Sequence, residues 1–254
     1  MAVKDIYVIG DSSRMVVHSF LEDLKSAGLS VHTMPANVAY IQEFPKTPIQ
    51  VVVCFDDDMT EEVMKYLRKA AREFGWSLYL IGKITGLSLN EKNEIEAIPG
   101  VHFPYWPVPV EKLLEEIKRN RKHILVVDDD IMMLRSLRSW LGEAFDVHPA
   151  PSGAAALEFL QHNTVDLVLL DYEMPNMNGK EVLEHIRSSV STKSLPVMFL
   201  TAKDDRTTVM NVMDLRPKGY ILKTSTPDEI KHTVFAFFAS QSSVADKDGK
   251  TEVY

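Results

Sequence analysis

The sequence has almost no cysteine and no long apolar run. Cys54 is the single cysteine among 254 residues, so no internal disulfide can form, and its place in an apolar run indicates a buried thiol. No apolar stretch approaches the ~20 residues that a membrane-spanning helix needs, and the amino-terminal residues lack a signal-peptide layout. These absences exclude a disulfide scaffold, and we expect a cytoplasmic protein that does not enter a membrane.

Positive charge is also scarce. The chain has 28 Lys and Arg against 36 Asp and Glu, which gives a net charge of −8. A nucleic-acid-binding surface must neutralise phosphates with clustered cations, so we expect no nucleic-acid partner. The one basic run, at residues 118–122, ends a helix-like segment, where cations suit the helix terminus. The sequence lacks a Walker loop and a dinucleotide fingerprint, and its eight histidines show no metal-ligand spacing.

Short apolar runs alternate with stretches of helical periodicity along the whole chain. This alternation is typical of a parallel sheet covered by helices. In the second half, strands are predicted at residues 123–127, 145–150, 166–170, 196–200 and 219–222. Helices are predicted at 131–143, at 152–162 with Ser152 as the cap, and from Pro227 onward.

The first half repeats this pattern. Strands are predicted at residues 6–9, 29–34, 50–55, 76–81 and 101–103, and helices at 14–27, 60–74 and 110–120. Ile124 follows Ile6 by 118 residues and Phe199 follows Tyr79 by 120, a period that indicates duplicated whole domains. We therefore predict one domain at 1–120 and another at 121–240. Residues 241–254 lack periodicity and are predicted to be a disordered tail.

Polar side chains stand at the carboxyl ends of four predicted strands in the second half. Asp128 and Asp129 follow the first strand, Asp171 ends the third, Thr201 ends the fourth and Lys223 ends the fifth. In an open parallel α/β sheet, sites form at this edge, where the strand order reverses. With the doubly wound order 2-1-3-4-5, the first and third strands are neighbours, so the three acids would meet in one pocket.

Crowded carboxylates raise one another's pKa and oppose folding unless positive charge is present. Hard oxygen ligands of this kind favour Mg²⁺. A carboxylate can act as the nucleophile in phosphoryl transfer and form an acyl phosphate. Because the transition state is mainly a problem of charge positioning, Mg²⁺, the Lys223 ammonium and the Thr201 hydroxyl are the groups that such a transfer requires.

Four motifs carry a resemblance to a known family. HILVVDDD, LVLLDYEMPNMNG, PVMFLTA and GYILK, in this order, resemble the receiver domain of bacterial two-component response regulators. The resemblance covers residues 121–240. It implies an α/β fold of the flavodoxin-like type, in which each domain is a doubly wound (βα)5 unit with a parallel sheet of order 2-1-3-4-5.

The resemblance also implies roles for individual residues. It implies Mg²⁺ as the cofactor, a histidine kinase or phosphotransfer protein as the phosphate donor, and a switched surface that contacts a downstream protein target. It implies no enzymatic activity beyond self-phosphotransfer and autodephosphorylation. The residues concerned are Asp171 as phosphoacceptor, Asp128 and Asp129 as metal-binding acids, Glu173 as a backbone-carbonyl ligand, Thr201 as the switch hydroxyl, Lys223 as the phosphate-pairing lysine and Tyr220 as the moving aromatic.

Thr224 departs from the family pattern, which usually has proline after the lysine. A cis bond before a non-proline residue costs ~3 kcal/mol, so the loop at residues 224–226 is expected to be built differently.

The first copy departs further. Gly10 stands at the place of the first acid, Ile81 at that of the switch threonine and Tyr105 at that of the lysine, while Asp56 still offers a carboxylate after the third strand. We expect a degenerate pseudo-receiver that serves docking or dimerisation, which leaves open a homodimer through a receiver face.

Two alternatives remain. A haloacid-dehalogenase-type phosphohydrolase also uses an aspartate nucleophile with Mg²⁺, but it expects a second aspartate where Glu173 stands and its other acids late in the chain. A purely structural tandem-receiver adaptor is the other alternative. No DNA-binding or catalytic output domain is recognised outside the two predicted domains, so output is expected to occur through protein contact.

Overall fold

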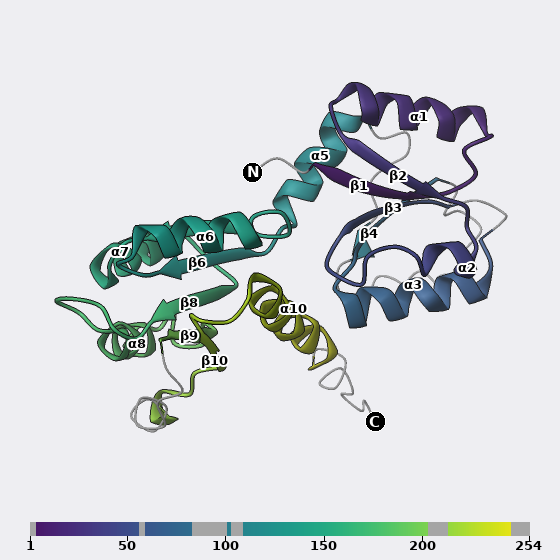
Figure 1. Ribbon diagram of the computed structural model, residues 1–254. Coiled ribbons are helices and arrows are strands. Elements are labelled where there is room, and N and C mark those ends of the chain that lie inside the picture. Colours follow the sequence, from purple (N-terminus) through teal and green to yellow (C-terminus); the bar gives the residue numbers. More distant parts are fainter. Residues whose placement is uncertain (1–3, 56–58, 83–100, 103–108, 203–212, 245–254) are drawn as a thin grey trace, which may run out of the picture. The chain divides into compact units, whose positions relative to one another are not determined.

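The computed structural model describes residues 4–55, 59–82, 101–102, 109–202 and 213–244 (Figure 1). The chain divides into two compact units, each built around one five-stranded parallel sheet. Among the described residues, no helix combines the length and the apolar character that crossing a bilayer would require. The predicted domain boundaries at residues 120 and 240 stay predictions.

The first unit is an α/β sandwich around an all-parallel sheet of order β2-β1-β3-β4-β5. Its strands are β1 (Asp5–Ile9), β2 (Ser30–Met34), β3 (Gln50–Phe55), β4 (Ser77–Gly82) and β5 (Val101–His102). Its described helices are α1 (Met15–Ser26), α2 (Val38–Ile41), α3 (Glu61–Phe74) and α5 (Val110–Arg119).

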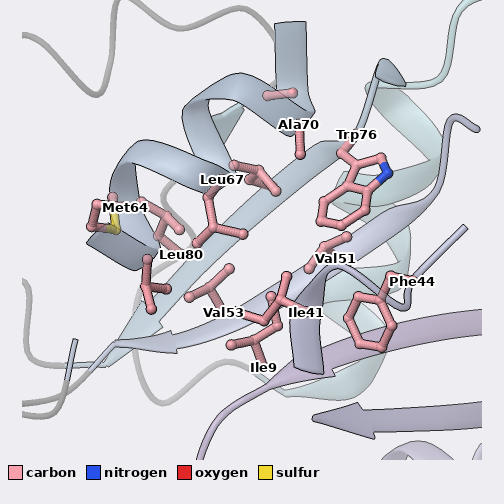
Figure 2. Close-up of a cluster of buried hydrophobic side chains, with 13 residues drawn as sticks. Ile9, Ile41, Phe44, Val51, Val53, Met64, Leu67, Ala70, Trp76 and Leu80 are labelled. Carbon is pink, nitrogen blue, oxygen red and sulfur yellow. The ribbon is translucent and has the colours of Figure 1, made fainter. Parts of the chain in front are cut away.

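Alternate residues of β3 face opposite sides of this sheet. Val51 and Val53 pack with Leu67 of α3 and with Trp76 (Figure 2). Val52, between them, packs in a second cluster that includes residues of α1 and α5. Burial of each such side chain contributes roughly 1.5–3 kcal/mol. Because both faces are covered, the strand appears in the sequence as a continuous apolar run.

The second unit has the same topology. Its sheet order is β10-β9-β8-β6-β7, so in both units the strands lie in the order 2-1-3-4-5, as the sequence predicts. Its strands are β6 (His123–Val127), β7 (Asp146–Ala150), β8 (Leu167–Asp171), β9 (Val197–Thr201) and β10 (Gly219–Leu222). Its described helices are α6 (Ile131–Leu141), α7 (Gly153–His162), α8 (Gly179–Ser188) and the 3-10 helix η2 (Met213–Leu215), and α10 (Pro227–Val244) follows β10.

Most element predictions hold to within a residue or two. The strands at 50–55, 123–127 and 219–222 match, and most others are displaced by one residue. The sequence analysis did not single out α2, whose four residues are too few for a periodic pattern, or α8. The helix α10 continues to Val244, so residues 241–244 are helical and not part of a disordered tail, because extending a formed helix costs little. Residues 245–254 and Phe103 lie outside the described residues.

Side chains cap the helices that border the second sheet. Ser152 caps α7 by accepting a hydrogen bond of 3.2 Å from an amide in its first turn, as predicted. Asp130 caps α6 in the same way at 2.8 Å. Asn178 and Glu181 form a reciprocal capping box at the start of α8. Each such cap is worth about 1 kcal/mol, and together they hold the helices at the carboxyl ends of the strands.

Arg121 ties the end of α6 to the start of the second unit. Its side chain is buried, and its Nη2 donates hydrogen bonds to the carbonyl oxygens of Gly142 (2.7 Å), Glu143 (3.0 Å) and Phe145 (2.6 Å). The residues of the basic run therefore have two different roles. Lys118 and Arg119 lie in the last turn of α5, as expected. Arg121 instead binds carbonyl groups that follow α6.

We predict that Arg121→Met lowers the free energy of unfolding of the second unit by about 1–3 kcal/mol, because buried carbonyl groups lose their donor. Urea denaturation followed by circular dichroism measures the loss. Arg119→Met is the matched control, since this side chain is 75% exposed and its removal should change little. Equal losses in the two variants would contradict the structural role given to Arg121.

Candidate functional site

The four predicted positions come together at the carboxyl edge of the second sheet. Asp128 follows β6, Asp171 is the last residue of β8, Thr201 is the last residue of β9 and Lys223 follows β10. The parallel register aligns these strand ends, with Leu222 opposite Thr201 in the β10–β9 pair. These residues therefore lie at the sheet edge and on the strands that the sequence predicts.

One lysine joins two buried carboxylates. The Nζ atom of Lys223 lies 2.8 Å from Oδ2 of Asp128 and 2.8 Å from Oδ2 of Asp171. Asp128 is 0% exposed and Asp171 is 2% exposed, whereas the lysine side chain is 19% exposed. Removal of one partner from a buried pair leaves an uncompensated charge, which is strongly destabilising. The geometry of the two aspartates thus depends on this ammonium group.

Burial and pairing act in opposite directions on these charges. Burial raises the pKa of Asp171, the ion pair with Lys223 lowers it and the charge of Asp128 raises it, so that the pKa lies above its usual value. Burial lowers the pKa of Lys223, but the two carboxylates together outweigh burial and raise the pKa above its ordinary value. The lysine is therefore positively charged at neutral pH.

Asp129 completes a group of three carboxylates. One oxygen from each of Asp128, Asp129 and Asp171 lies within 4.8 Å of the other two, and Asp129 is exposed to solvent. Three carboxylates and one ammonium carry a formal charge of −2. This charge and the all-oxygen donor set fit one hard dication such as Mg²⁺, which typically takes one or two carboxylates and keeps several waters.

Backbone groups fix the two buried aspartates. Oδ1 of Asp128 accepts a hydrogen bond from the amide of Asp130 (2.9 Å), and Oδ1 of Asp171 accepts one from the amide of Glu173 (3.3 Å). The start of α8 packs directly on this strand end, because a Cβ at Gly179 would lie 2.3 Å from the carbonyl oxygen of Asp171. Only glycine permits this approach. The sequence analysis did not single out Gly179, although it lies in the motif that contains Asp171.

The remaining predicted residues border this group. Thr201 is half-buried, and its carbonyl oxygen accepts a hydrogen bond from the amide of Lys223 (2.8 Å). The ring of Tyr220 is half-buried, with its centroid 6.0 Å from that of Phe199, and burial raises its pKa. The side chain of Glu173 is exposed, and the metal-binding role of its carbonyl stays a prediction.

The loop after the lysine is closed by a turn. The amide of Ser225 donates to the carbonyl oxygen of Leu222 at 3.0 Å. Thr226 and Glu229 then form reciprocal side-chain-to-amide hydrogen bonds of 3.3 and 2.8 Å at the start of α10. Polar caps and a turn thus build the loop that follows Lys223, where the family pattern has proline.

Strand register identifies the equivalent positions in the first sheet. The amide of Gly10 donates to the last residue of β2 at 3.0 Å, as the amide of Asp128 donates to the last residue of β7 at 3.2 Å. Gly10 is therefore the counterpart of Asp128. Because Ile9 pairs with Val53 and Val127 pairs with Leu170, the next residues on β3 and β8 correspond, and Cys54 stands at the place of Asp171.

This register corrects one assignment in the first unit. Ile81 pairs with Cys54 as Leu200 pairs with Asp171, so Gly82, and not Ile81, stands at the level of Thr201. The error arose because the repeat offset is not constant along the chain. Asp56 lies two residues beyond Cys54 in the sequence. It lies outside the described residues, as does Tyr105.

The position in the first unit that corresponds to Asp171 has no carboxylate. Cys54 is half-buried, whereas the sequence predicts a buried thiol, and burial raises the pKa of the thiol to about 12. A Cβ at Gly10 would lie 2.8 Å from Cβ of Cys54, so the backbone position opposite the cysteine has no room for a larger side chain.

Comparisons with known proteins agree with the geometry of the second unit. Residues 124–235 match the response regulator receiver domain. The chain is similar to chemotaxis protein CheY-3 of Vibrio cholerae, with 31% identity over 127 residues that make up 49% of this chain and 98% of CheY-3. It is also similar to the DNA-binding response regulator MtrA of Mycobacterium leprae, with 35% identity over 136 residues, or 50% of this chain and 59% of MtrA.

A third relative is a probable cyclic di-GMP phosphodiesterase of Vibrio cholerae, which is 32% identical over 120 residues, or 47% of this chain and 27% of the phosphodiesterase. The chain thus spans nearly all of CheY-3 but less than two thirds of the other two relatives. From the receiver match and the near-complete coverage of CheY-3, we conclude that the chain belongs to the response regulator receiver family of two-component signalling proteins.

Proposed function

We propose that the second domain is a Mg²⁺-dependent switch that is phosphorylated on Asp171. The observation that carries this proposal is the position of the Lys223 ammonium, which lies 2.8 Å from the buried carboxylates of both Asp128 and Asp171. The lysine holds Asp171 at the strand end and supplies positive charge where a phosphoryl group would arrive. Membership of the receiver family supports the same chemistry.

The carboxylates of Asp128, Asp129 and Asp171 are the groups that would hold Mg²⁺. When bound, the ion would offset the negative charge of the three acids and of the phosphoryl oxygens. The bond formation and the pairing of the added charge are assigned to residues of the chain. Asp171, as a carboxylate, supplies the electron pair for a new O–P bond, and the bond from phosphorus to the donor breaks with its electrons leaving on the donor. Lys223 pairs with the added charge.

The half-buried Thr201 and Tyr220 are the proposed switch residues. Both lie on strands whose register is tied to Lys223, since Leu222 pairs with Thr201 and Tyr220 pairs with Phe199. A phosphoryl group at Asp171 would attract the Thr201 hydroxyl, and the Tyr220 ring would then repack. The added charge would thereby shift the equilibrium between two conformations of the surface around these residues.

We infer that the first domain is a degenerate receiver. Gly10 in place of the first acid, Cys54 in place of the phosphoacceptor and Gly82 in place of the switch threonine support this inference. A neutral thiol of pKa about 12 can neither hold Mg²⁺ nor accept phosphate as a carboxylate does. Docking or dimerisation is its proposed role.

The proposed partners are a histidine kinase or phosphotransfer protein as the phosphate donor and a downstream protein as the target. A purely structural tandem-receiver adaptor is the second candidate function. It is favoured by the glycine and cysteine that stand at the Asp128 and Asp171 positions of the first sheet. The paired and buried charges of the second sheet are, however, costly for a protein that never uses them. The haloacid-dehalogenase-type phosphohydrolase is the weaker alternative, because the family match is to receivers.

We predict that Mg²⁺ stabilises the metal-free protein through these acids. At a concentration a hundredfold above its Kd, Mg²⁺ should raise the free energy of unfolding by about 2.7 kcal/mol. Thermal denaturation with Mg²⁺ or a chelator measures this shift. Asp129→Asn should weaken the stabilisation at a given Mg²⁺ concentration. Asp130→Asn, which keeps a capping residue in the same loop, should not weaken it, and equal responses in the two variants would contradict the assigned ligands.

We predict that incubation with acetyl phosphate and Mg²⁺ adds one phosphoryl group to the chain. Intact-mass analysis should find this adduct in the wild type and in Asp56→Ala, and should find none in Asp171→Ala. The result is expected because, among the described residues, the acids and the lysine meet in the second sheet. Two adducts, one removed by each substitution, would mean that the first domain is also an acceptor. If the wild type gives no adduct with a kinase donor either, the switch is refuted.

A further inference from the structure

A second group of ligand-type side chains lies away from the acidic site. His123 is the first residue of β6 and Asp146 is the first residue of β7, and the parallel register sets them opposite one another. His148 lies two residues further along β7 and so projects from the same face of the sheet. Because both strands begin here, the group lies at the amino edge of the sheet, whereas Asp128 and Asp171 lie at the carboxyl edge.

Three donor atoms of this group converge. Nδ1 of His123 lies 3.1 Å from Nε2 of His148, and Oδ2 of Asp146 lies 3.6 Å and 3.8 Å from these two nitrogens. A triangle with these sides fits on a circle of about 2.0 Å radius, so one point lies that far from all three atoms. Zinc binds histidine nitrogen at about 2.0–2.1 Å and carboxylate oxygen at about 2.0–2.2 Å.

We propose that His123, Asp146 and His148 form a binding site for a transition-metal dication such as Zn²⁺, with water in the remaining position. Two imidazoles and one carboxylate are ligands that suit zinc and its neighbours, whereas Mg²⁺ prefers oxygen ligands alone. The two edges of one sheet thus select different ions. This site does not depend on phosphorylation of Asp171.

The surroundings of the three side chains suit an ion that enters from solvent. The side chains of His123, Asp146 and His148 are 36%, 37% and 31% exposed. The ring of His148 packs against Phe159 of α7, with 5.1 Å between centroids, which limits its freedom to turn. Packing of this kind partly pre-organises a ligand and reduces the entropy that binding must overcome.

The two imidazole rings are 12° from parallel, with 5.4 Å between their centroids. Without a metal, one nitrogen donates a hydrogen bond to the other. To present both lone pairs to an ion, the donor ring would move its proton to its other nitrogen, which needs no rotation of the ring. Burial lowers the pKa of His148, and the Asp146 carboxylate opposes this shift. The guanidinium of Arg138 also acts on His148 and repels a cation.

A bound ion would link β6 to β7, which lies at the edge of the second sheet. β7 pairs with β6 alone in this sheet, over the five residue pairs from His123 and Asp146 to Val127 and Ala150. An ion held by residues of both strands would fix the end of this pairing. Zinc would therefore stabilise the second domain independently of Mg²⁺.

Isothermal titration of the full chain with Zn²⁺, after removal of metals and in saturating Mg²⁺, tests the proposal. We expect one tight site per chain in the wild type. His148→Asn and Asp146→Asn should each weaken the affinity at least about tenfold. His185→Asn, which alters an exposed histidine of α8, should leave it unchanged. Arg138→Gln should tighten binding, an outcome that mere damage to the fold would not give.

Cobalt substitution adds a spectroscopic readout. Co²⁺ at this site should give the intense visible absorption of low-coordinate cobalt, and His148→Asn should abolish it. Retained thermal stabilisation by Mg²⁺ shows that each variant is folded. The proposal is overturned if the wild type binds no Zn²⁺ tightly, or if its tight site survives both His148→Asn and Asp146→Asn in folded protein.

Discussion

The position of a single ammonium group is the constraint on which the second domain depends. Lys223 reaches two carboxylates that the sheet buries almost completely. Without this cation, adjacent strands would end in like charges inside the protein, and burial would drive protons onto them. The lysine comes from the end of β10, two strands away from β8, so the pairing of all three strands is needed to complete the site.

The same sheet architecture without this charge arrangement is found in the first domain. Its strand order and backbone hydrogen bonding match those of the second domain, but glycine and cysteine stand where the two buried aspartates would be. A neutral thiol and a glycine require no compensating cation. The fold therefore does not require a charged site, because the apolar faces of β1, β3 and β4 stabilise it independently of any charge at the strand ends.

The amino-acid sequence predicted the fold, and the sheet edge at which the polar side chains meet, because both depend on local patterns. Apolar runs that end in acids, threonine or lysine specify which groups meet once the sheet order is known. The sequence could not specify strand register, and for this reason Ile81 was assigned in place of Gly82. Register also brings His123 and His148 together, although they are 25 residues apart and show no ligand spacing. Glycine is required at position 179 because the backbone there lies close to the carbonyl oxygen of Asp171, a contact that only the folded chain reveals.

The central claim is that Asp171 is the acceptor, and the chemistry of an acyl phosphate permits a direct test. Borohydride reduces an aspartyl phosphate to homoserine, so the phosphorylated protein can be reduced, digested and sequenced by mass spectrometry. The account predicts homoserine at position 171 alone, and none when Mg²⁺ is removed beforehand. Homoserine at position 56, 128 or 129 instead would contradict the assignment of the acceptor and, with it, the role given to Lys223.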